Sequence, residues 1–209
     1  PVSMLSNEVY LQERMKNYDP QRATPSTEIR PGVLLRAESE ETTHLSVIDK
    51  EGNAVAVTTT LNNSYGSRTV VGGAGFFLND EMDDFTTQPG KPNMYGLVQG
   101  ERNAIQPRKR PLSSMTPTIV LRKDGSLWFA LGARGGPRII SAVMQSVINV
   151  IDFKMDIQQA VDAPRIHHQW LPDEILFEPN GLSPDTAAIL GRYGHKFAPE
   201  AKYIASATA

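Results

Sequence analysis

The chain has 209 residues, a formal net charge of −2 and no cysteine. A chain of this length can bury a sizeable core, so a single domain is the default expectation. The small net charge provides no electrostatic surface for nucleic acid or an anionic membrane. No apolar run approaches the roughly 18 residues that a membrane-spanning helix needs. The lack of cysteine excludes disulfides, thiolate catalysis and cysteine metal ligands.

The N-terminal part predicts one helix followed by a loop. Residues 6–18 mix apolar and polar positions, and either Ser6 or Asn7 is suited to cap a helix there. Residues 19–32 contain three prolines and a glycine, which predicts irregular structure.

Two β-hairpins follow from alternating apolar positions on both sides of short turn sequences. Residues 45–49 and 54–60 flank a turn with the sequence Lys-Glu-Gly-Asn. Residues 118–122 and 127–131 flank a second turn, with the sequence Lys-Asp-Gly-Ser.

Three helices are predicted in the C-terminal half. Apolar residues recur at helical spacing from Ile139 to Ile151, which predicts a helix that begins near Pro137. Shorter helices are expected over residues 156–162 and 184–192, the second with Ser183 as its N-cap. Because strands and then helices follow one another without strict alternation, the pattern indicates an α+β fold.

Thr42 is the first candidate for chemistry. It begins a run that alternates as a strand does, and it follows a charged stretch that ends at Glu41. A threonine hydroxyl is a weak nucleophile unless a base lies beside it. If the Glu41–Thr42 peptide bond is cut, the freed α-amine supplies that base, because its pKa of about 7.7–8.0 leaves part of it neutral near physiological pH. Taken alone, a Thr-Thr pair at a strand start is more often β-branched strand filler.

Later motifs favour the interpretation of Thr42 as a nucleophile over that of strand filler, because five segments follow Thr42 in a recognisable order and spacing. Together they resemble the small catalytic subunit of γ-glutamyltranspeptidase, an N-terminal-nucleophile hydrolase. The resemblance extends from about Asp19 to about Phe197. The five segments are residues 49–62, 78–85, 110–118, 135–140 and 163–173.

The resemblance implies part of a four-layer αββα sandwich with antiparallel sheets. It implies that residues 1–41 are the C-terminal tail of the large subunit, and that residues 42–209 are the small catalytic subunit, truncated at its C-terminus. It also implies self-cleavage, in which the Thr42 hydroxyl attacks the Glu41 carbonyl and water opens the resulting ester. The same hydroxyl would then carry a γ-glutamyl ester from a glutathione-like donor to water or to an amino-acid or peptide amine, without a cofactor.

The catalytic group implied by the resemblance comprises Thr42, Thr60, Gly135 and Gly136. Thr60 would hydrogen-bond the hydroxyl or amine of Thr42. The two glycines lie before a helix N-terminus, where backbone N–H groups can stabilise an oxyanion. The alternative is that Thr60 is an ordinary strand residue and that the glycine pair forms a tight turn.

A γ-glutamyl group carries an α-carboxylate and an α-ammonium, and the resemblance assigns residues to both. Ser113 and Ser114 would donate to the carboxylate, Asp84 and Glu81 would bind the ammonium, and Asn62 can do either. The alternative is that these residues form a solvated turn and a loop.

The long segment from Thr86 to Arg110 matches the family's lid, with Tyr95 at its tip. The family also uses an arginine of the large subunit to bind the carboxylate.

The four histidines lack the spacing of a zinc site, so no metal is expected. The segment from Arg165 to Trp170 is instead interpreted as structural and packed beneath the sheet. By resemblance, the parent protein is expected in the periplasm or outside the cell.

The chain alone is expected to be an uncleaved, inactive fragment that self-associates through apolar surface left by the missing large subunit. Two other functions stay open: an N-terminal-nucleophile acylase for glutaryl or cephalosporin-type amides, and a non-catalytic homologue.

Overall fold

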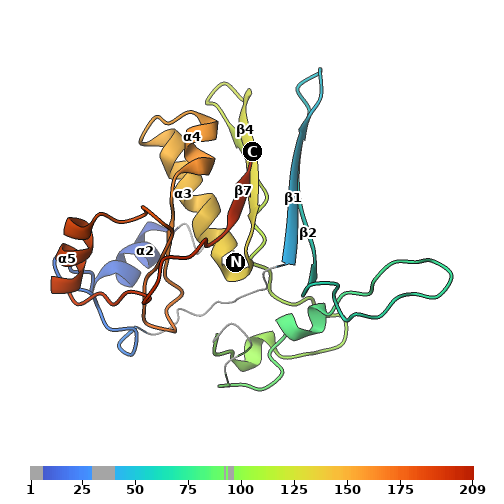
Figure 1. The fold of residues 1–209 in the computed structure, drawn as a ribbon, viewed down its shortest axis with the longest axis horizontal. Helices are drawn as coiled ribbons and strands as arrows, with labels where there is room; N and C mark the ends of the chain where they lie inside the picture. Colours follow the sequence, from blue (N-terminus) through green and yellow to red (C-terminus); the bar gives the residue numbers. More distant parts are fainter. Residues whose placement is uncertain (1–6, 30–40, 92, 94–96) are drawn as a thin grey trace.

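The computed structural model describes residues 7–29, 41–91, 93 and 97–209. Figure 1 shows three packed layers: a hairpin, a small sheet and a layer of helices. The hairpin consists of β1 (Glu41–Ile48) and β2 (Ala54–Asn62). The sheet has the order β3-β4-β7, with β3 at Thr118–Leu121, β4 at Leu127–Arg134 and β7 at Ser206–Thr208. All pairings between these strands are antiparallel, which confirms the predicted α+β class.

The β1–β2 hairpin confirms the first predicted hairpin, and both strands extend beyond the predicted bounds. The turn is closed by Asp49, whose Oδ1 accepts hydrogen bonds from the backbone N–H groups of Glu51 at 3.0 Å and Asn53 at 2.8 Å. Gly52 has a φ of 85°, a conformation in which a side chain is strained. The local turn chemistry therefore fixes the pairing of the two strands.

Alternation divides the hairpin into two unlike faces. One face points toward β4, and β4 contacts both β1 and β2. The opposite face carries apolar side chains that stay substantially exposed, namely Leu45, Val47, Val55 and Val57. A sheet with one packed and one uncovered apolar face is the arrangement that a further covering layer would complete.

The two sheets approach each other closely where His44 of β1 crosses Gly132 of β4. A Cβ atom placed on Gly132 would lie 2.2 Å from the His44 ring. The ring is fixed in the hairpin, with Nδ1 2.7 Å from Thr58 Oγ1 and Nε2 3.1 Å from Ser46 Oγ. Gly132 therefore allows the imidazole to lie directly on the backbone of β4.

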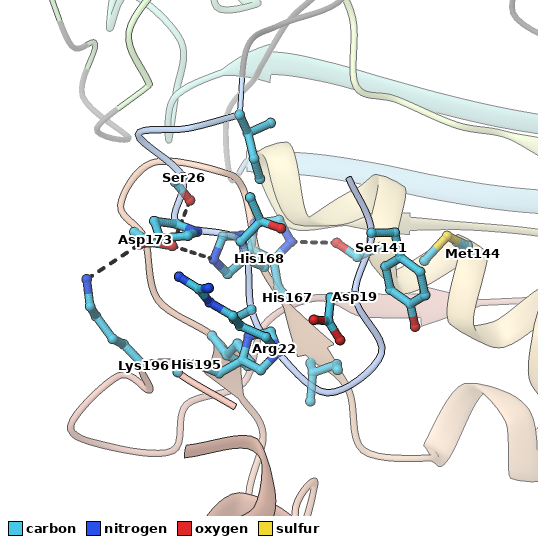
Figure 2. Close-up of a pocket in the computed structure, with 18 of the residues that line it drawn as sticks. Asp19, Arg22, Ser26, Ser141, Met144, His167, His168, Asp173, His195 and Lys196 are labelled. Carbon is cyan, nitrogen blue, oxygen red and sulfur yellow. Dashed lines mark hydrogen bonds and ion pairs between the residues drawn. The ribbon is translucent and has the colours of Figure 1, made fainter. Parts of the chain in front are cut away.

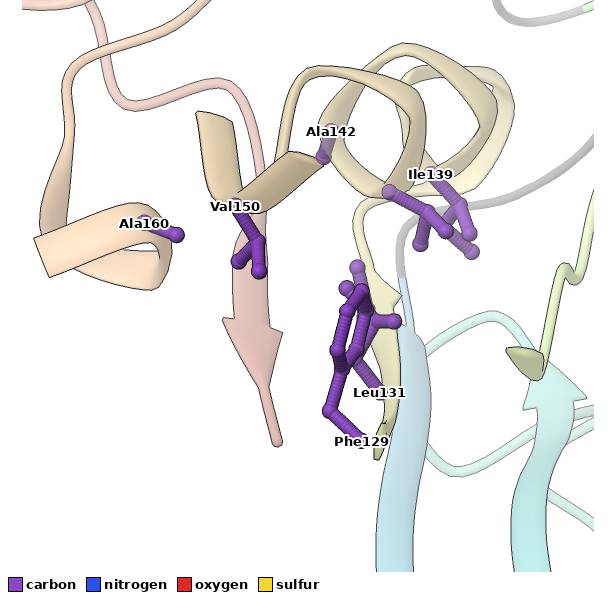
Figure 3. Close-up of a cluster of buried hydrophobic side chains, with 8 residues drawn as sticks. Phe129, Leu131, Ile139, Ala142, Val150 and Ala160 are labelled. Atoms are coloured by element: carbon purple, nitrogen blue, oxygen red, sulfur yellow. The ribbon is translucent and has the colours of Figure 1, made fainter. Parts of the chain in front are cut away.

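The core lies between β4 and the helical layer, as Figure 3 shows. The long helix α3 (Ile139–Ile151) begins after a 3-10 turn, η3 (Gly136–Arg138), close to the predicted start at Pro137. The short helix α4 (Ile157–Asp162) has a capping box, in which Asp156 and Gln159 bond each other's backbone N–H groups. Fully or nearly fully buried members of the core are Leu131, Ala133, Ile139, Ala142 and Ala160.

The remaining helices also match their sequence signals. Helix α2 (Glu8–Met15) is capped by Asn7, one of the two predicted caps. Helix α5 (Pro184–Arg192) is capped by Ser183, as predicted.

The segment from Arg165 to Trp170 differs from its predicted position. It contains β5 (Ile166–His167), which pairs with β6 (Leu176–Phe177) and lies along α3, on the helical side of the molecule. Gln145 of α3 binds both backbone groups of Ile166, accepting from its N–H at 3.0 Å and donating to its carbonyl at 2.8 Å. The prediction of a place beneath the sheet was therefore wrong, because side chains of α3 supply the partners of this short strand.

Candidate active site

Thr42 lies at the start of β1, directly opposite Thr60 of β2. Its side chain is 6% exposed, although it lies within two residues of the strand end. The register shifts between Glu41 and Thr42, so that Glu41 pairs with Asn62 instead of following the ladder to Leu61. Such a bulge redirects the side chains on either side of it and is common beside active sites. The bulge falls on the Glu41–Thr42 peptide bond, which the sequence indicates as the candidate cleavage site.

The residues after Thr60 turn the chain sharply toward the next candidate group. Thr60 Oγ1 accepts a hydrogen bond from the backbone N–H of Asn62 at 2.9 Å. Asn62 has a φ of 74°, in the left-handed region that asparagine tolerates better than most residues, and it is 1% exposed. Its Nδ2 donates to the Asp80 carbonyl at 3.2 Å. The Thr60 side chain and the Asn62 backbone therefore belong to the same turn at the end of β2.

Asp80 joins the end of β2 to the short helix that carries the predicted ammonium ligands. Its carboxylate accepts from the backbone N–H of Asn63 at 3.0 Å and from Asn63 Nδ2 at 2.5 Å. The helix η1 (Glu81–Asp84) follows immediately, with Glu81 half-buried and Asp84 6% exposed. Asp84 is thus not part of a solvated turn, which was the alternative interpretation.

A buried polar network holds Asp84 from behind. Asn103, at the end of η2 (Glu101–Asn103), donates through Nδ2 to the Asp84 carbonyl at 2.6 Å and to Gln99 Oε1 at 3.0 Å. Its Oδ1 accepts from the backbone N–H of Leu112 at 3.1 Å. Thr86 closes the network, donating from Oγ1 to Gln99 Oε1 at 2.9 Å. Asn103 thereby connects Asp84 to the segment that leads into Ser113.

Sequence reasoning did not identify this network. Asn103, Gln99 and Thr86 fall in a segment rich in proline, glycine and asparagine, and polar residues there are indistinguishable from solvated loop. Tyr95, the predicted tip of the lid, lies outside the described residues.

The serine pair and the glycine pair are in direct contact. Ser114 is 1% exposed, and its hydroxyl donates to the Gly136 carbonyl at 3.0 Å. Ser113 is exposed, and its Oγ accepts from the backbone N–H of Met115 at 3.3 Å. Gly135 has a φ of 139°, and a Cβ there would lie 2.9 Å from Ala205. The turn therefore needs glycine at this position for both conformation and space.

The packing of the two sheets sets Thr42 and the glycine pair at the same end of the molecule. His44 lies over Gly132, and the two strands run in opposite directions away from this crossing (Figure 1). Moving from His44 to Thr42 on β1 and from Gly132 to Gly135 on β4 leads to the same edge. The described residues thus gather four predicted groups there: the threonine pair, Asn62 with η1, the serine pair and the glycine pair.

Other chemistry is limited within the described part of the chain. Residues 7–29, 41–91, 93 and 97–209 contain no group of three or more His, Asp or Glu side chains arranged to hold a metal ion. In the same ranges, no helix is both long enough and apolar enough to cross a membrane. Burial lowers the pKa of His44, which favours the neutral form of its ring between the sheets.

Two packed antiparallel sheets covered by a layer of helices match the fold of the N-terminal-nucleophile hydrolases. The gamma-glutamyltranspeptidase family model matches residues 1–209. The chain therefore belongs to the γ-glutamyltranspeptidase family.

Relatives and solved structures agree with this membership. The chain is 52% identical over 198 residues to the glutathione hydrolase proenzyme of Escherichia coli K12, covering 95% of this chain and 34% of that protein. It is 38% identical over 195 residues to glutathione hydrolase proenzyme 2 of Schizosaccharomyces pombe, covering 93% of this chain and 31% of that protein. The chain thus spans about a third of the length of these relatives.

Among solved structures, a mutant γ-glutamyltranspeptidase of Helicobacter pylori superposes with a TM-score of 0.75 at 51% identity, covering 79% of this chain and 88% of that chain. The cephalosporin acylase of Bacillus halodurans superposes with a TM-score of 0.74 at 27% identity, covering 97% of this chain and 33% of that chain.

Proposed function

We propose that the parent protein transfers or hydrolyses γ-glutamyl groups through an ester on Thr42, after cleavage of its own Glu41–Thr42 bond. The observation that carries the proposal is the place of Thr42: buried, opposite Thr60, at a register shift that coincides with the bond to be cut. Cleavage would free the amine that serves as base for the hydroxyl of the same residue.

In this proposal each part of the site has a role in the reaction. The Thr42 hydroxyl attacks the γ-carbonyl of a glutathione-like donor, and its proton passes to the α-amine. The backbone N–H groups of Gly135 and Gly136 stabilise the oxyanion of the tetrahedral intermediate. The same amine then returns the proton to the leaving amine, and water or an acceptor amine opens the ester.

The substrate's charged groups match the polar residues at this edge. Asp84 and Glu81 supply anionic groups for the α-ammonium, while Ser113 and Ser114 supply hydroxyl donors for the α-carboxylate. The buried network around Asn103 supports the backbone of Asp84, so that the residue carrying the carboxylate is held in place before the substrate arrives. Tyr95 would close over the bound glutamyl group.

The division of the chain follows from the same proposal. Residues 1–41 are the C-terminal tail of a large subunit, and residues 42–209 belong to the small catalytic subunit. The large subunit is the expected partner of the exposed apolar face of the β1–β2 hairpin, and it would supply an arginine for the carboxylate. Without it, the chain is expected to remain uncleaved and inactive and to self-associate, which light scattering would test. Export to the periplasm or the exterior is proposed from family membership.

The test uses the full-length parent with Thr42 intact, with Thr42→Ala and with Thr42→Ser. Mass spectrometry measures cleavage between residues 41 and 42, and release of a chromophore from a γ-glutamyl anilide measures turnover. Thr42→Ala is expected to abolish both, while Thr42→Ser retains part of each because the hydroxyl is kept. If processing and turnover survive Thr42→Ala, the proposal is wrong.

An acylase is the second candidate, and the similarity to the Bacillus halodurans cephalosporin acylase favours it. A glutaryl group has no α-ammonium, so the two candidates differ in their need for Asp84. Asp84→Asn should impair turnover of the γ-glutamyl anilide strongly and leave turnover of a glutaryl anilide nearly unchanged.

A further inference from the structure

The segment that precedes the proposed cleavage site is attached to the catalytic half at a place remote from Thr42. We call residues 18–29 the strap. Figure 2 shows the strap residues Arg22 and Ser26 among residues of the catalytic half such as Asp173 and His195. This attachment plays no part in the chemistry proposed above.

Ser26 is the centre of the attachment. It is 1% exposed, and its hydroxyl donates to Asp173 Oδ1 at 2.6 Å (Figure 2). Its backbone carbonyl accepts from the indole Nε1 of Trp170 at 2.7 Å. The hydroxyl and the carbonyl of one strap residue are therefore bonded to the catalytic half, and the hydroxyl is bonded to a charged group. Hydrogen bonds of this kind are about twice as strong as neutral ones.

Asp173 is held in its charged form by the residues around it. The Ser26 hydroxyl is the main cause that lowers the pKa of Asp173, and Lys196 adds to it. Lys196 Nζ lies 3.4 Å from Oδ2, and His168 Nε2 lies 3.4 Å from Oδ1. The carboxylate is thus fixed by the catalytic half and directed at the strap.

A second contact sets the direction of the strap. The backbone N–H of Ala23 donates to the Tyr193 carbonyl at 2.6 Å, just past the end of α5. Gly194 follows with a φ of 98°, and a Cβ there would lie 3.9 Å from the Ala23 methyl group. The strap is therefore bonded at two points three residues apart.

Apolar packing beneath the strap is incomplete. A cavity of about 600 Å³ lies between the strap and the helical side, with Ile29, Met144, Ile166 and Ile175 among its lining residues. An interface that leaves such a space buries less apolar surface than a close-packed one. Its strength consequently depends on the hydrogen bonds of Ser26 and Ala23.

We propose that Ser26, Trp170 and Asp173 form an anchor that keeps the piece ending at Glu41 on the catalytic half once the Glu41–Thr42 bond is cut. The inference rests on the proposed function for the cut itself. In the intact chain the contact is intramolecular, so its strength is masked by a high effective concentration. After the cut, the covalent bond no longer supports this contact, so the affinity of the contact can be measured directly on the cut chain.

The experiment separates the anchor from self-cleavage. A chain carrying Thr42→Ala and a site-specific protease sequence between positions 41 and 42 is cut quantitatively. Size-exclusion chromatography at micromolar concentration then shows whether the two pieces co-elute, and fluorescence anisotropy on dilution gives their Kd. The variants are Ser26→Ala, Trp170→Phe and, as the matched control, Thr27→Ala, whose hydroxyl is on an exposed neighbouring residue. Circular dichroism of each cut chain verifies that the catalytic half stays folded.

The two pieces of the cut chain that carries no further substitution are expected to co-elute. Ser26→Ala should raise Kd about tenfold or more, because a bond to a charged group is lost, and Trp170→Phe about two- to tenfold. Thr27→Ala should leave Kd unchanged. The anchor is refuted if the pieces of this otherwise unsubstituted cut chain separate at micromolar concentration. It is also refuted if the two pieces bind each other as tightly with Ser26→Ala as with Thr27→Ala. Neither outcome depends on whether Thr42 is a nucleophile.

Discussion

Thr42 and Thr60 face each other across the antiparallel pair β1–β2, and the register of the pair changes at the next residue toward the N-terminus. Thr60 therefore lies on the same face of the hairpin as Thr42, where the proposal places its contact with the Thr42 hydroxyl or liberated amine. It also accepts the Asn62 N–H bond that begins the turn toward Asp84. One side chain thus connects the nucleophile strand to the proposed substrate site.

Thr60→Ala tests whether Thr60 acts on Thr42 or is only an ordinary strand residue. We expect kcat of the full-length parent on a γ-glutamyl anilide to fall by about a hundredfold, as for loss of a proton-handling group. Thr59→Ala is the matched control, since Thr59 points to the exposed face of the same strand. Equal effects of the two substitutions would contradict the assignment.

Gly132→Ala should destabilise the packing of the two sheets. The new methyl group would overlap the His44 ring, which the hairpin holds on both of its nitrogens. Overpacking of this kind costs about 1–3 kcal/mol of unfolding free energy, measured by urea denaturation. Adding His44→Ala should recover part of the loss by making room. Gly72→Ala is the control, because an added Cβ there meets nothing within 4 Å and Gly72, like Gly132, does not have a positive φ.

Asn103→Ala should affect both stability and substrate binding. The side chain makes three buried hydrogen bonds, to the Asp84 carbonyl, Gln99 and the Leu112 N–H. Leaving these groups unsatisfied costs about 1–3 kcal/mol of unfolding free energy. We also expect a higher KM for the γ-glutamyl donor, because Asp84 loses its support. Gln106→Ala, at an exposed position of the same segment, should change neither quantity.

His167 makes the fold sensitive to mild acid. Burial is the main cause that lowers the pKa of its imidazole, which is 4% exposed. Gln169 Oε1 faces Nε2 at 3.0 Å, so Nε2 carries the proton and Nδ1 accepts from the Ser141 hydroxyl at 2.5 Å (Figure 2).

The sign of the effect follows from the lowered pKa. The unfolded chain binds a proton near pH 6.5, whereas the folded chain binds it only at lower pH, so stability falls as pH decreases below about 6.5. His167→Gln should flatten the dependence of Tm on pH between about 7 and 5. His195→Gln, a control variant outside the Ser141 contact, should leave the slope of Tm against pH unchanged. An unchanged slope for His167→Gln would refute this role.

Glu178→Gln should be among the most destabilising polar substitutions. Glu178 and Arg165 are both buried, with Oε2 3.1 Å from the guanidinium, and Glu178 Oε1 also accepts from the Ile204 N–H at 2.9 Å. Removing one charge leaves the buried Arg165 uncompensated, at a cost of about 3–5 kcal/mol in unfolding free energy. Thermal denaturation measures the loss of stability, and Glu200→Gln, on an exposed side chain, is the control in that measurement.

The sequence alone determined the elements whose signals are local. The Asp-Gly and Gly-Asn turns, the Ser183 and Asn7 caps and the helical period from Ile139 each depend on neighbours within a few residues, so they could be predicted. The ordered motifs were also sufficient to identify the family and the candidate site residues, since they are themselves linear features of the chain.

Tertiary structure alone decided which residues support that site. His44 on Gly132, Asn103 behind Asp84 and Ser26 on Asp173 join segments that are far apart in sequence, and no periodicity or turn pattern encodes such pairs. The segment from Arg165 to Trp170 was misplaced for the same reason: its partners are side chains of α3, chosen by packing. Local chemistry fixes the elements, whereas the burial of polar groups against distant partners fixes their arrangement.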